Sequence, residues 1–353
     1  MKLPTEQQAV PEIIDLLNEL FNGSSKSVLL QQVGASGRYD YLISVPGYRF
    51  AAEYKSYASA GQLTNAIGQL KKYTEAYPHG GELSLIIVPF MGPVGQRLCD
   101  ESGISWLDLS GNAKIFAPGL RIWIEGRPNK YSERGRPPNV FAPKSSRVSR
   151  QLLLYPQRFQ TQADVARQTG LGDGYVSKIA RRLQQEHYID ANAQGAVRPH
   201  DPDLLLDAWY DAYDFNHHRI IKGHVPARTG DELLQRVYKV ISHENREWAA
   251  TGLSAAWLYT SFASFRLVTV YLSSIPSHSL LNEIEFSDEP KGANLWLVLP
   301  DDESIFHGIQ MKEGIPCVSP MQTYLDLKAQ PERSKDAAVE LRRKLLNWGT
   351  HEK

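Results

Sequence analysis

The chain has 353 residues, of which 42% are hydrophobic and 22% charged, and its 39 Lys and Arg are balanced by 39 Asp and Glu. This length predicts two or three domains, and the composition is typical of a globular rather than a disordered protein. Only two cysteines occur, Cys99 and Cys317, which excludes a disulfide framework and suits a reducing cytoplasm. The first residues lack the apolar core of a signal peptide, and no apolar run is long enough to span a bilayer. We therefore expect a cytoplasmic protein with no membrane partner.

Residues 1–126 show the alternating pattern of an α/β domain. The expected helices cover residues 11–21, 62–77 and 94–101, and the expected strands cover residues 27–33, 39–45, 48–54, 83–89, 104–107, 113–116 and 121–125. Pro46-Gly47 is a turn dipeptide, so the second and third strands should form a hairpin. The predicted order is α-β-β-β-α-β-α-β, followed by further strands.

Three charged side chains should meet on that hairpin. Asp40 lies on its first strand, and Glu53 and Lys55 lie on its second. Residues two apart on a strand point to the same face, so Glu53 and Lys55 should project together, near Asp40. Two carboxylates can hold Mg²⁺, and an ammonium can orient water or stabilise phosphoryl charge.

This constellation resembles the PD-(D/E)xK nuclease superfamily, whose core has the αβββαβ order predicted above. The helix that follows carries Gln69 and Tyr73, which is similar to the QxxxY element of RecB-like members. The resemblance implies a restriction-endonuclease-like core with catalytic residues Asp40, Glu53, Lys55, Gln69 and Tyr73, and with Asp40 and Glu53 as ligands of Mg²⁺. Glu12, on the first helix, is a candidate for a further acid.

Two alternatives for this region stay open. Nuclease folds of this type also serve as inactive binding platforms, and Asp40, Glu53 and Lys55 could form a solvated ion cluster at a sheet edge.

Residues 127–148 are predicted to be a linker. The stretch Gly126–Ser149 contains four prolines, and its six Lys and Arg face only one Glu. The linker is either a solvated tether or a basic strap along DNA phosphates.

Residues 149–200 predict a winged helix-turn-helix. A first helix starts near Val148, a second covers residues 162–169 with Thr161 as its cap, and a third covers residues 175–187. Glycines between the second and third helices supply the turn, and residues 188–190 and 196–198 pair as the wing. The apolar positions Val165, Ala166, Leu171, Val176, Ile179, Ala180 and Leu183 should pack inward.

The outer face of the third helix carries hydroxyl groups and cations. From Lys144 to Asp190 the chain has eight Lys and Arg against four Asp and Glu, a local excess that favours nucleic-acid binding. The stretch resembles the winged helix-turn-helix of bacterial transcription regulators, and the expected DNA contacts are Tyr175, Ser177, Lys178, Arg181 and Arg182. The alternative is a winged helix used only for protein contacts.

Residues 201–353 predict an α+β domain, so that the whole chain is an α/β and α+β multidomain protein. Its strings 251–259 and 317–327, together with the winged helix, resemble the AbiEi-type antitoxins of type IV toxin–antitoxin systems. In that family the winged helix represses the operon and the C-terminal domain delivers the antitoxin effect. Gly252 and Ser254 precede a helix as in nucleotidyltransferases, but the next strand, residues 267–272, carries no acid, so we expect no active transferase.

Other polar residues of this domain predict ordinary surface positions. Asp203, Asp207, Asp211 and Asp214 recur at helical spacing and predict a solvated acidic face. His217 and His218 lack a third metal ligand and are expected at the surface. In the first domain, Cys99 is expected in the core.

Two functions from different classes follow from these patterns. The preferred one is a DNA-binding transcriptional regulator, an AbiEi-like antitoxin that forms a homodimer and has DNA and a cognate toxin as partners. The alternative is a Mg²⁺-dependent nuclease that the winged helix targets to DNA. A scaffold in which both parts have lost their chemistry is a third possibility.

Overall fold

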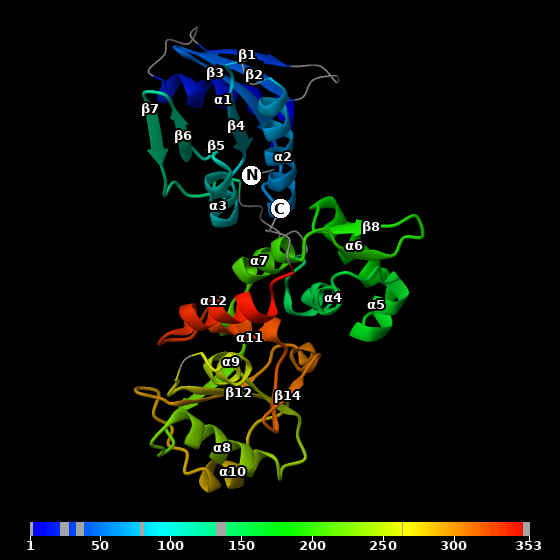
Figure 1. Cartoon of the computed structure of the whole chain (residues 1–353), viewed down its shortest axis with the longest axis vertical. Coiled ribbons are helices and arrows are strands. Elements are labelled where there is room, and N and C mark those ends of the chain that lie inside the picture. Colours follow the sequence, from blue (N-terminus) through cyan, green and yellow to red (C-terminus); the bar gives the residue numbers. More distant parts are fainter. Residues whose placement is uncertain are drawn as a thin grey trace. The chain divides into compact units, whose positions relative to one another are not determined.

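The computed structural model describes residues 3–21, 28–32, 39–77, 81–131, 139–262 and 264–348. The chain forms two compact units, and each combines separate stretches of sequence. Unit 1 comprises residues 1–139 and 181–190, and unit 2 comprises residues 140–180 and 191–353. The mixed α/β character expected from the sequence is confirmed (Figure 1).

Unit 1 is built on a seven-stranded sheet whose strands follow their order in the chain. Its strands are β1 (Leu29–Gln32), β2 (Tyr41–Val45), β3 (Tyr48–Tyr54), β4 (Leu83–Val88), β5 (Ser105–Asp108), β6 (Ala113–Ala117) and β7 (Leu120–Ile124). The three central strands β3, β4 and β5 are parallel, and the outer pairs are antiparallel. The predicted order of helices and strands is confirmed for this unit.

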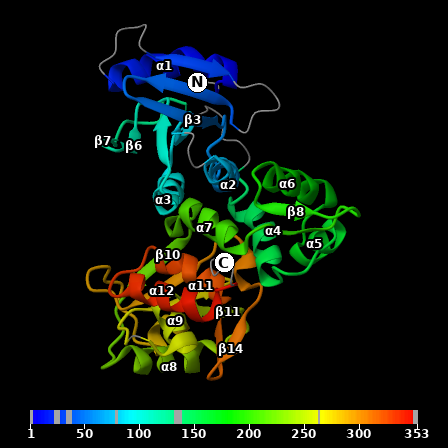
Figure 2. The same ribbon diagram turned by 45° about the horizontal axis from the view of Figure 1, so that its top comes forward.

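Helices cover both faces of this sheet (Figures 1 and 2). They are α1 (Glu6–Leu20), α2 (Ala60–Ala76) and α3 (Pro93–Ser102). Side chains alternate along β3: Phe50 and Tyr54 pack in one cluster with Ile13 of α1, whereas Ala51 packs in another with Leu63 of α2. Burial on both faces explains why β4, in the middle of the sheet, is almost continuously apolar.

The expected linker is shorter than the sequence predicts. Arg127 N donates to Asn112 Oδ1 at 2.8 Å, and Tyr131 is buried in the core of unit 1. Helix α4 (Pro143–Leu154) already begins at Pro143, because proline is favoured in the first helical turn, where its missing N–H and fixed φ do no harm. Residues 132–138, which include Arg134 and Arg136 of the proposed strap, lie outside the described residues.

The predicted helix-turn-helix elements are present. Thr161 caps α5 (Gln162–Thr169) by accepting from Asp164 N at 3.1 Å, and Gly170 ends it with φ +65°. Helix α6 (Asp173–Gln185) begins two residues earlier than expected, and the wing consists of β8 (Ile189–Ala191) paired with β9 (Val197–Pro199). The seven apolar positions expected to point inward are all buried.

The rest of unit 2 surrounds a six-stranded mixed sheet in the order β10-β13-β12-β11-β15-β14. Its strands are β10 (Arg219–Gly223), β11 (Trp248–Thr251), β12 (Val268–Leu272), β13 (Leu295–Leu299), β14 (Gln310–Lys312) and β15 (Ile315–Cys317). Its helices are α7 (Pro202–Ala212), α8 (Gly230–Ile241), α9 (Gly252–Thr260), α10 (His278–Glu283), α11 (Pro320–Leu327) and α12 (Ser334–Leu345), with short 3₁₀ turns at Phe215–His217 and Glu303–Phe306. The strands β10, β11, β14 and β15 were not predicted, because each is three to five residues long and carries little alternation.

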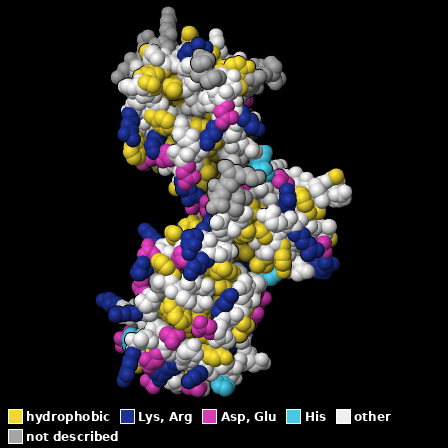
Figure 3. All heavy atoms as spheres, in the orientation of Figure 1, with side chains coloured by type: hydrophobic (Ala, Val, Ile, Leu, Met, Phe, Trp, Pro, Cys, Tyr) yellow, Lys and Arg dark blue, Asp and Glu magenta, His cyan; other side chains and the backbone are white. Residues whose placement is uncertain are grey.

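Two surface assignments in unit 2 are wrong. Asp203 and Asp207 are not a solvated face, because Arg342 of α12 binds them at 2.8 and 2.9 Å. His218 is buried, with its Nδ1 accepting from Asp301 N at 3.1 Å, whereas its neighbour His217 is exposed as expected. Cys99 lies in the core, as predicted. On the face that Figure 3 shows, cationic and acidic side chains are interspersed.

Candidate functional sites

The charged residues of the β2–β3 hairpin come together in unit 1. Lys55 Nζ contacts the Glu53 carboxylate and lies 3.6 Å from Asp40 Oδ2. Asp40 directly precedes β2, and its Oδ2 also accepts from Tyr54 N at 2.9 Å. This backbone hydrogen bond fixes the Asp40 carboxylate at the end of β3, where Glu53 and Lys55 are.

Glu53 is the most enclosed member of this cluster. The residue is 3% exposed, and burial raises the pKa of its carboxyl to about 7. Lys55 opposes that increase, and the nearby Asp40 carboxylate adds to it. The arrangement thus holds two carboxylates and one ammonium together at a partly buried position.

The cluster supplies some, but not all, of the ligands that a hard divalent cation needs. Within the described residues, no group of three or more His, Cys, Asp or Glu side chains is placed to hold a metal. Asp40 and Glu53 supply two carboxylates, and Mg²⁺ is commonly bound through one or two carboxylates while it keeps several waters. These two residues would hold such an ion, and Lys55 stands beside them.

The two residues of the QxxxY resemblance have different surroundings. Gln69 lines a cleft of about 430 Å³ together with Lys55. Tyr73 instead donates to Glu82 Oε2 at 3.3 Å and lies edge-on against the ring of Tyr39, with 4.8 Å between the ring centroids. Tyr73 therefore contacts the residue that directly precedes Asp40 and does not line the cleft with Gln69.

Glu12 is not part of the cluster. Its carboxylate accepts from the Tyr131 hydroxyl, in the layer where α1 packs on the sheet. Tyr54 belongs to that same layer, and adjacent residues of a strand point to opposite faces, so Glu53 faces away from it. The suggestion that Glu12 supplies a further acid is therefore wrong.

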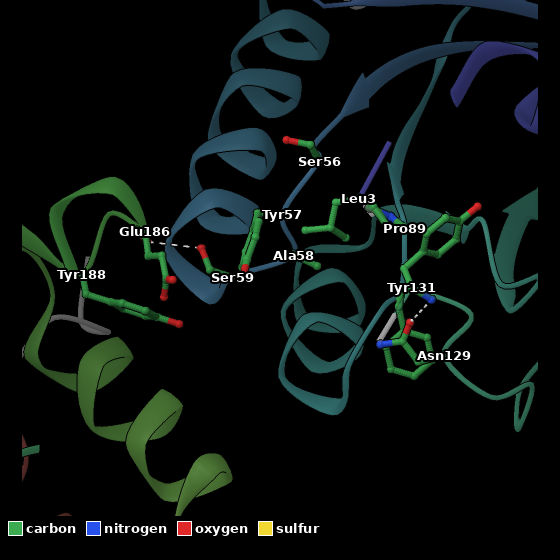
Figure 4. A pocket seen from close by; sticks show the side chains of 11 residues that line it. Leu3, Ser56, Tyr57, Ala58, Ser59, Pro89, Asn129, Tyr131, Glu186 and Tyr188 are labelled. Atoms are coloured by element: carbon green, nitrogen blue, oxygen red, sulfur yellow. Dashed lines mark hydrogen bonds between the residues drawn. The ribbon is translucent and has the colours of Figure 1, made fainter. Parts of the chain in front are cut away.

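A second pocket, of about 350 Å³, opens beyond the carboxyl ends of β3 and β4 (Figure 4). Such ends are frequent ligand positions in α/β proteins. Tyr57 and Phe90 line it from the loops after these strands, and Tyr188 lines it from the segment 181–190. Glu186, on its wall, is already paired with Arg182 at 2.5 Å, so we assign no ligand to this pocket.

The predicted DNA contacts lie on α6. Tyr175, Lys178 and Arg181 are exposed and recur every three residues, so they share one helical face, and Ser177 is half-buried. The Tyr175 hydroxyl is 2.9 Å from Ser145 Oγ. Its ring lies 5.5 Å from the ammonium of Lys144 on α4, which adds a further cation beside this face.

Arg182 differs from the other two predicted cations, Lys178 and Arg181. Its guanidinium lies 4.5 Å from the centroid of the Tyr57 ring, and its Nε pairs with Glu186 at 2.5 Å. These contacts are all within unit 1, and they occupy the side chain. Among the five predicted residues, Arg182 is thus held by protein groups, whereas Lys178 and Arg181 extend from exposed positions.

The two C-terminal strings meet at a buried carboxylate that sequence reasoning missed. Asp326 Oδ2 accepts from Thr251 Oγ1 at 2.5 Å, and its Oδ1 accepts from Tyr213 and Tyr271. Gln322 Nε2 donates to Asp326 Oδ1 at 2.7 Å, and Arg150 Nη2 donates to Gln322 Oε1 at 2.6 Å. The spacing of Gln322 and Asp326 by one helical turn was a visible signal, but their distant partners were not.

The turn that enters α9 is filled from inside the protein. Gly252 has φ +58°, and a Cβ there would lie 2.0 Å from Gln330 Nε2. Gln330 Oε1 accepts from Leu253 N at 2.9 Å, and its Nε2 donates to Thr269 Oγ1. The start of α9, where a transferase would bind phosphate, is therefore occupied by the Gln330 amide.

In the part of the chain that the structure describes, no helix is long and apolar enough to cross a membrane. Comparison of the chain with protein-family models, with curated proteins and with solved structures found no match in any of the three.

Proposed function

We propose that this protein is a DNA-binding transcriptional regulator. The observation that carries the proposal is the two-sided character of α6. Its apolar side, with Val176 and Ile179, is buried. Tyr175, Lys178 and Arg181 are exposed along the other side. A helix with hydroxyl and cationic groups on its free face suits the DNA major groove. Thr161 and Gly170 fix the preceding helix and turn, so the exposed side chains start from a defined backbone.

The test is a DNA-binding titration after selection of a site from a random duplex pool. Lys178→Ala combined with Arg181→Ala removes two phosphate or base contacts, so the slope of log affinity against log salt should fall by about two. Gln184→Ala, an exposed uncharged position on the same helix, is the matched control. Unchanged affinity and slope in the double variant would overturn the assignment.

A more specific role rests on resemblance alone. The strings 251–259 and 317–327 resemble AbiEi-type antitoxins, which favours a homodimeric repressor with a cognate toxin as its partner. Sedimentation of the full chain tests the dimer: a single monomeric species at all concentrations would contradict it. Co-expression with a toxin encoded beside the gene tests the antitoxin role, because protection of growth should require the chain.

The carboxylate–lysine cluster favours a second candidate, metal-dependent hydrolysis of a phosphodiester. Asp40 and Glu53 are the residues that would hold Mg²⁺, which supplies charge neutralisation at phosphate and activation of water. Lys55 contacts Glu53 and lines the adjoining cleft, where its ammonium would stabilise phosphoryl charge. Gln69 lies on the same cleft and can hydrogen-bond a phosphate or sugar.

Cleavage of DNA and RNA with Mg²⁺ or Mn²⁺ tests this candidate. Asp40→Asn and Glu53→Gln keep the size of each side chain and remove its charge, so both should abolish cutting. Glu101→Gln, an exposed acid on α3, controls for the loss of one negative charge. Cutting that persists in both site variants would mean that it comes from elsewhere.

A further inference from the structure

A polar cleft of about 430 Å³ runs beside α2 in unit 1. Gln62, Asn65, Gln69 and Lys72 line it, and their spacing places them on one side of the helix. Lys55 lines it as well, and no Asp or Glu is among the described residues that line it. The cleft is thus rich in amide groups, and its positive charge comes from Lys72, because the Lys55 ammonium is already paired with Glu53 and Asp40.

Gly68 stands in the interior of α2 and faces this cleft. Glycine in a helix interior destabilises the helix by about 0.5–1 kcal/mol relative to alanine. Nothing lies within 4 Å of the position that a Cβ would take there, so no neighbouring protein atom would prevent a side chain at this position. A site that tolerates a side chain yet lacks one leaves room for another molecule to approach the helix backbone.

Two further atoms indicate that the cleft is incomplete without a ligand. Among the described residues, Thr64 Oγ1 and Gln62 Oε1 are buried side-chain oxygens with no hydrogen-bond partner. Both residues line the cleft. A buried polar atom without a partner costs stability, and a hydroxyl or an amide can bond a phosphate or sugar oxygen once the side chain turns.

We propose that this cleft binds the phosphodiester backbone of a polynucleotide strand, which passes closest to α2 at Gly68. The ligand carries negative charge because both charged side chains among the described lining residues are lysines, and the Asp40 and Glu53 carboxylates that pair with Lys55 are not part of the lining. Amide side chains along one face suit a repeating sugar-phosphate chain, which carries oxygens at regular intervals. The proposal extends the second candidate function, because Lys55 belongs to both sites, but binding itself requires neither metal nor cleavage.

The test measures binding in the presence of EDTA, so that no strand is cut. The full chain carries Lys178→Ala and Arg181→Ala, which removes the exposed cations of α6. Fluorescence anisotropy follows twenty-nucleotide oligo-dT and oligo-rU probes. The two probes share the phosphodiester backbone, and a preference for one identifies the sugar that the cleft favours.

Three substitutions at Gly68 separate the effect of side-chain volume on binding from the effect of side-chain charge. Gly68→Ala is the matched control, because it favours the helix and adds little bulk. Gly68→Glu places a negative charge in the cleft and should weaken binding by about tenfold or more relative to Gly68→Ala. Gly68→Lys has similar bulk with the opposite charge and should bind within about threefold of Gly68→Ala, or more tightly.

Equal affinities for Gly68→Ala and Gly68→Glu would overturn the proposal, and so would an equal loss in Gly68→Glu and Gly68→Lys. Thermal melting checks folding, and Lys72→Glu at the rim gives the same readout if Gly68→Glu does not fold. Binding without any cleavage in Mg²⁺ would refute only the hydrolase candidate. Cleavage that Gly68→Glu leaves intact, with unchanged binding, would refute only the cleft.

Discussion

Arg150 of α4 and Gln322 of α11 share a 2.6 Å hydrogen bond in the interior of unit 2, where neither side chain reaches solvent. Arg147, one turn earlier on α4, adds a bidentate pair to Asp302: its Nε donates to Oδ1 and its Nη2 donates to Oδ2, both at 2.9 Å. Bidentate arginine–carboxylate pairs fix orientation as well as distance. The first helix of the winged helix is therefore joined rigidly to the six-stranded sheet domain.

The buried Arg150 should be replaceable by an apolar side chain of similar length. Its Nε and Nη1 have no hydrogen-bond partner, and burial lowers its pKa. An apolar substitution therefore removes the energetic cost of burying a cation. We expect Arg150→Met to unfold within about 2 kcal/mol of the wild type, because removal of the buried cation offsets the loss of the hydrogen bond to Gln322. Arg150 also packs over the Trp209 ring, with its Cζ 5.1 Å from the ring centroid, so Arg150→Ala should be about 2–4 kcal/mol less stable than Arg150→Met. Urea unfolding measures both, with the exposed Arg158→Ala as control; equal stability of the two variants would contradict this account.

Two buried groups should give opposite pH dependences to the stability of unit 2. Burial raises the pKa of Asp326 to about 6, so its contribution is complete below pH 4 and is lost as the pH rises through 6. Burial lowers the pKa of His218 to about 4, so its contribution is complete above pH 6.5 and is lost as the pH falls. Between about pH 4 and 6 these two effects offset each other.

Asp326→Asn should remove the contribution to stability that is lost as the pH rises. The free energy of unfolding of this variant should then rise with pH between 4 and 6 more steeply than that of the wild type, by up to about 1.4 kcal/mol per pH unit. His218→Gln should change the slope in the opposite direction. Denaturant unfolding at several pH values checks both, and parallel curves for all three proteins would show that the assignment is wrong.

Two glycines of α2 should respond oppositely to alanine. A Cβ at Gly61 would lie 2.1 Å from Glu186 O and 2.8 Å from His187 Cβ, so the segment 181–190 would have to shift. We expect Gly61→Ala to destabilise unit 1 by about 1–3 kcal/mol. Gly68→Ala meets nothing within 4 Å and should stabilise α2 by up to about 1 kcal/mol. Thermal melting compares them, and similar shifts in both variants would contradict the close approach at Gly61.

Tyr73 should act as a positioning residue for Asp40 through the ring of Tyr39. If the hydrolase proposal holds, Tyr73→Phe keeps the edge-on ring contact and loses the hydroxyl contacts with Tyr39 and Glu82, so we expect metal-dependent cleavage within about threefold of the wild type. Tyr73→Ala frees the Tyr39 ring and should lower the cleavage rate by about tenfold or more, because small displacements of a reacting group are costly. An equal loss in both variants would point to the hydroxyl instead.

Local patterns in the sequence determined much of the secondary structure. Thr161 before α5, Gly170 after it and the apolar spacing of α6 act within a few residues, so the helix-turn-helix elements could be predicted without the fold. The alternation around Asp40, Glu53 and Lys55 likewise predicted that the three side chains meet. Pro143 was misread as part of a linker, because a proline at a helix start and a proline in a coil give the same local signal.

Only the tertiary structure decided which side chains are free. Arg182 and Arg181 are neighbours in a basic helix, yet Tyr57 and Glu186 hold the first and leave the second exposed. Asp326 and Thr251 lie 75 residues apart and share a hydrogen bond of 2.5 Å. Such pairs form because packing of the core brings distant segments together and buried polar groups must then find partners. A one-dimensional pattern indicates which residues can make these contacts, but the fold selects the partner.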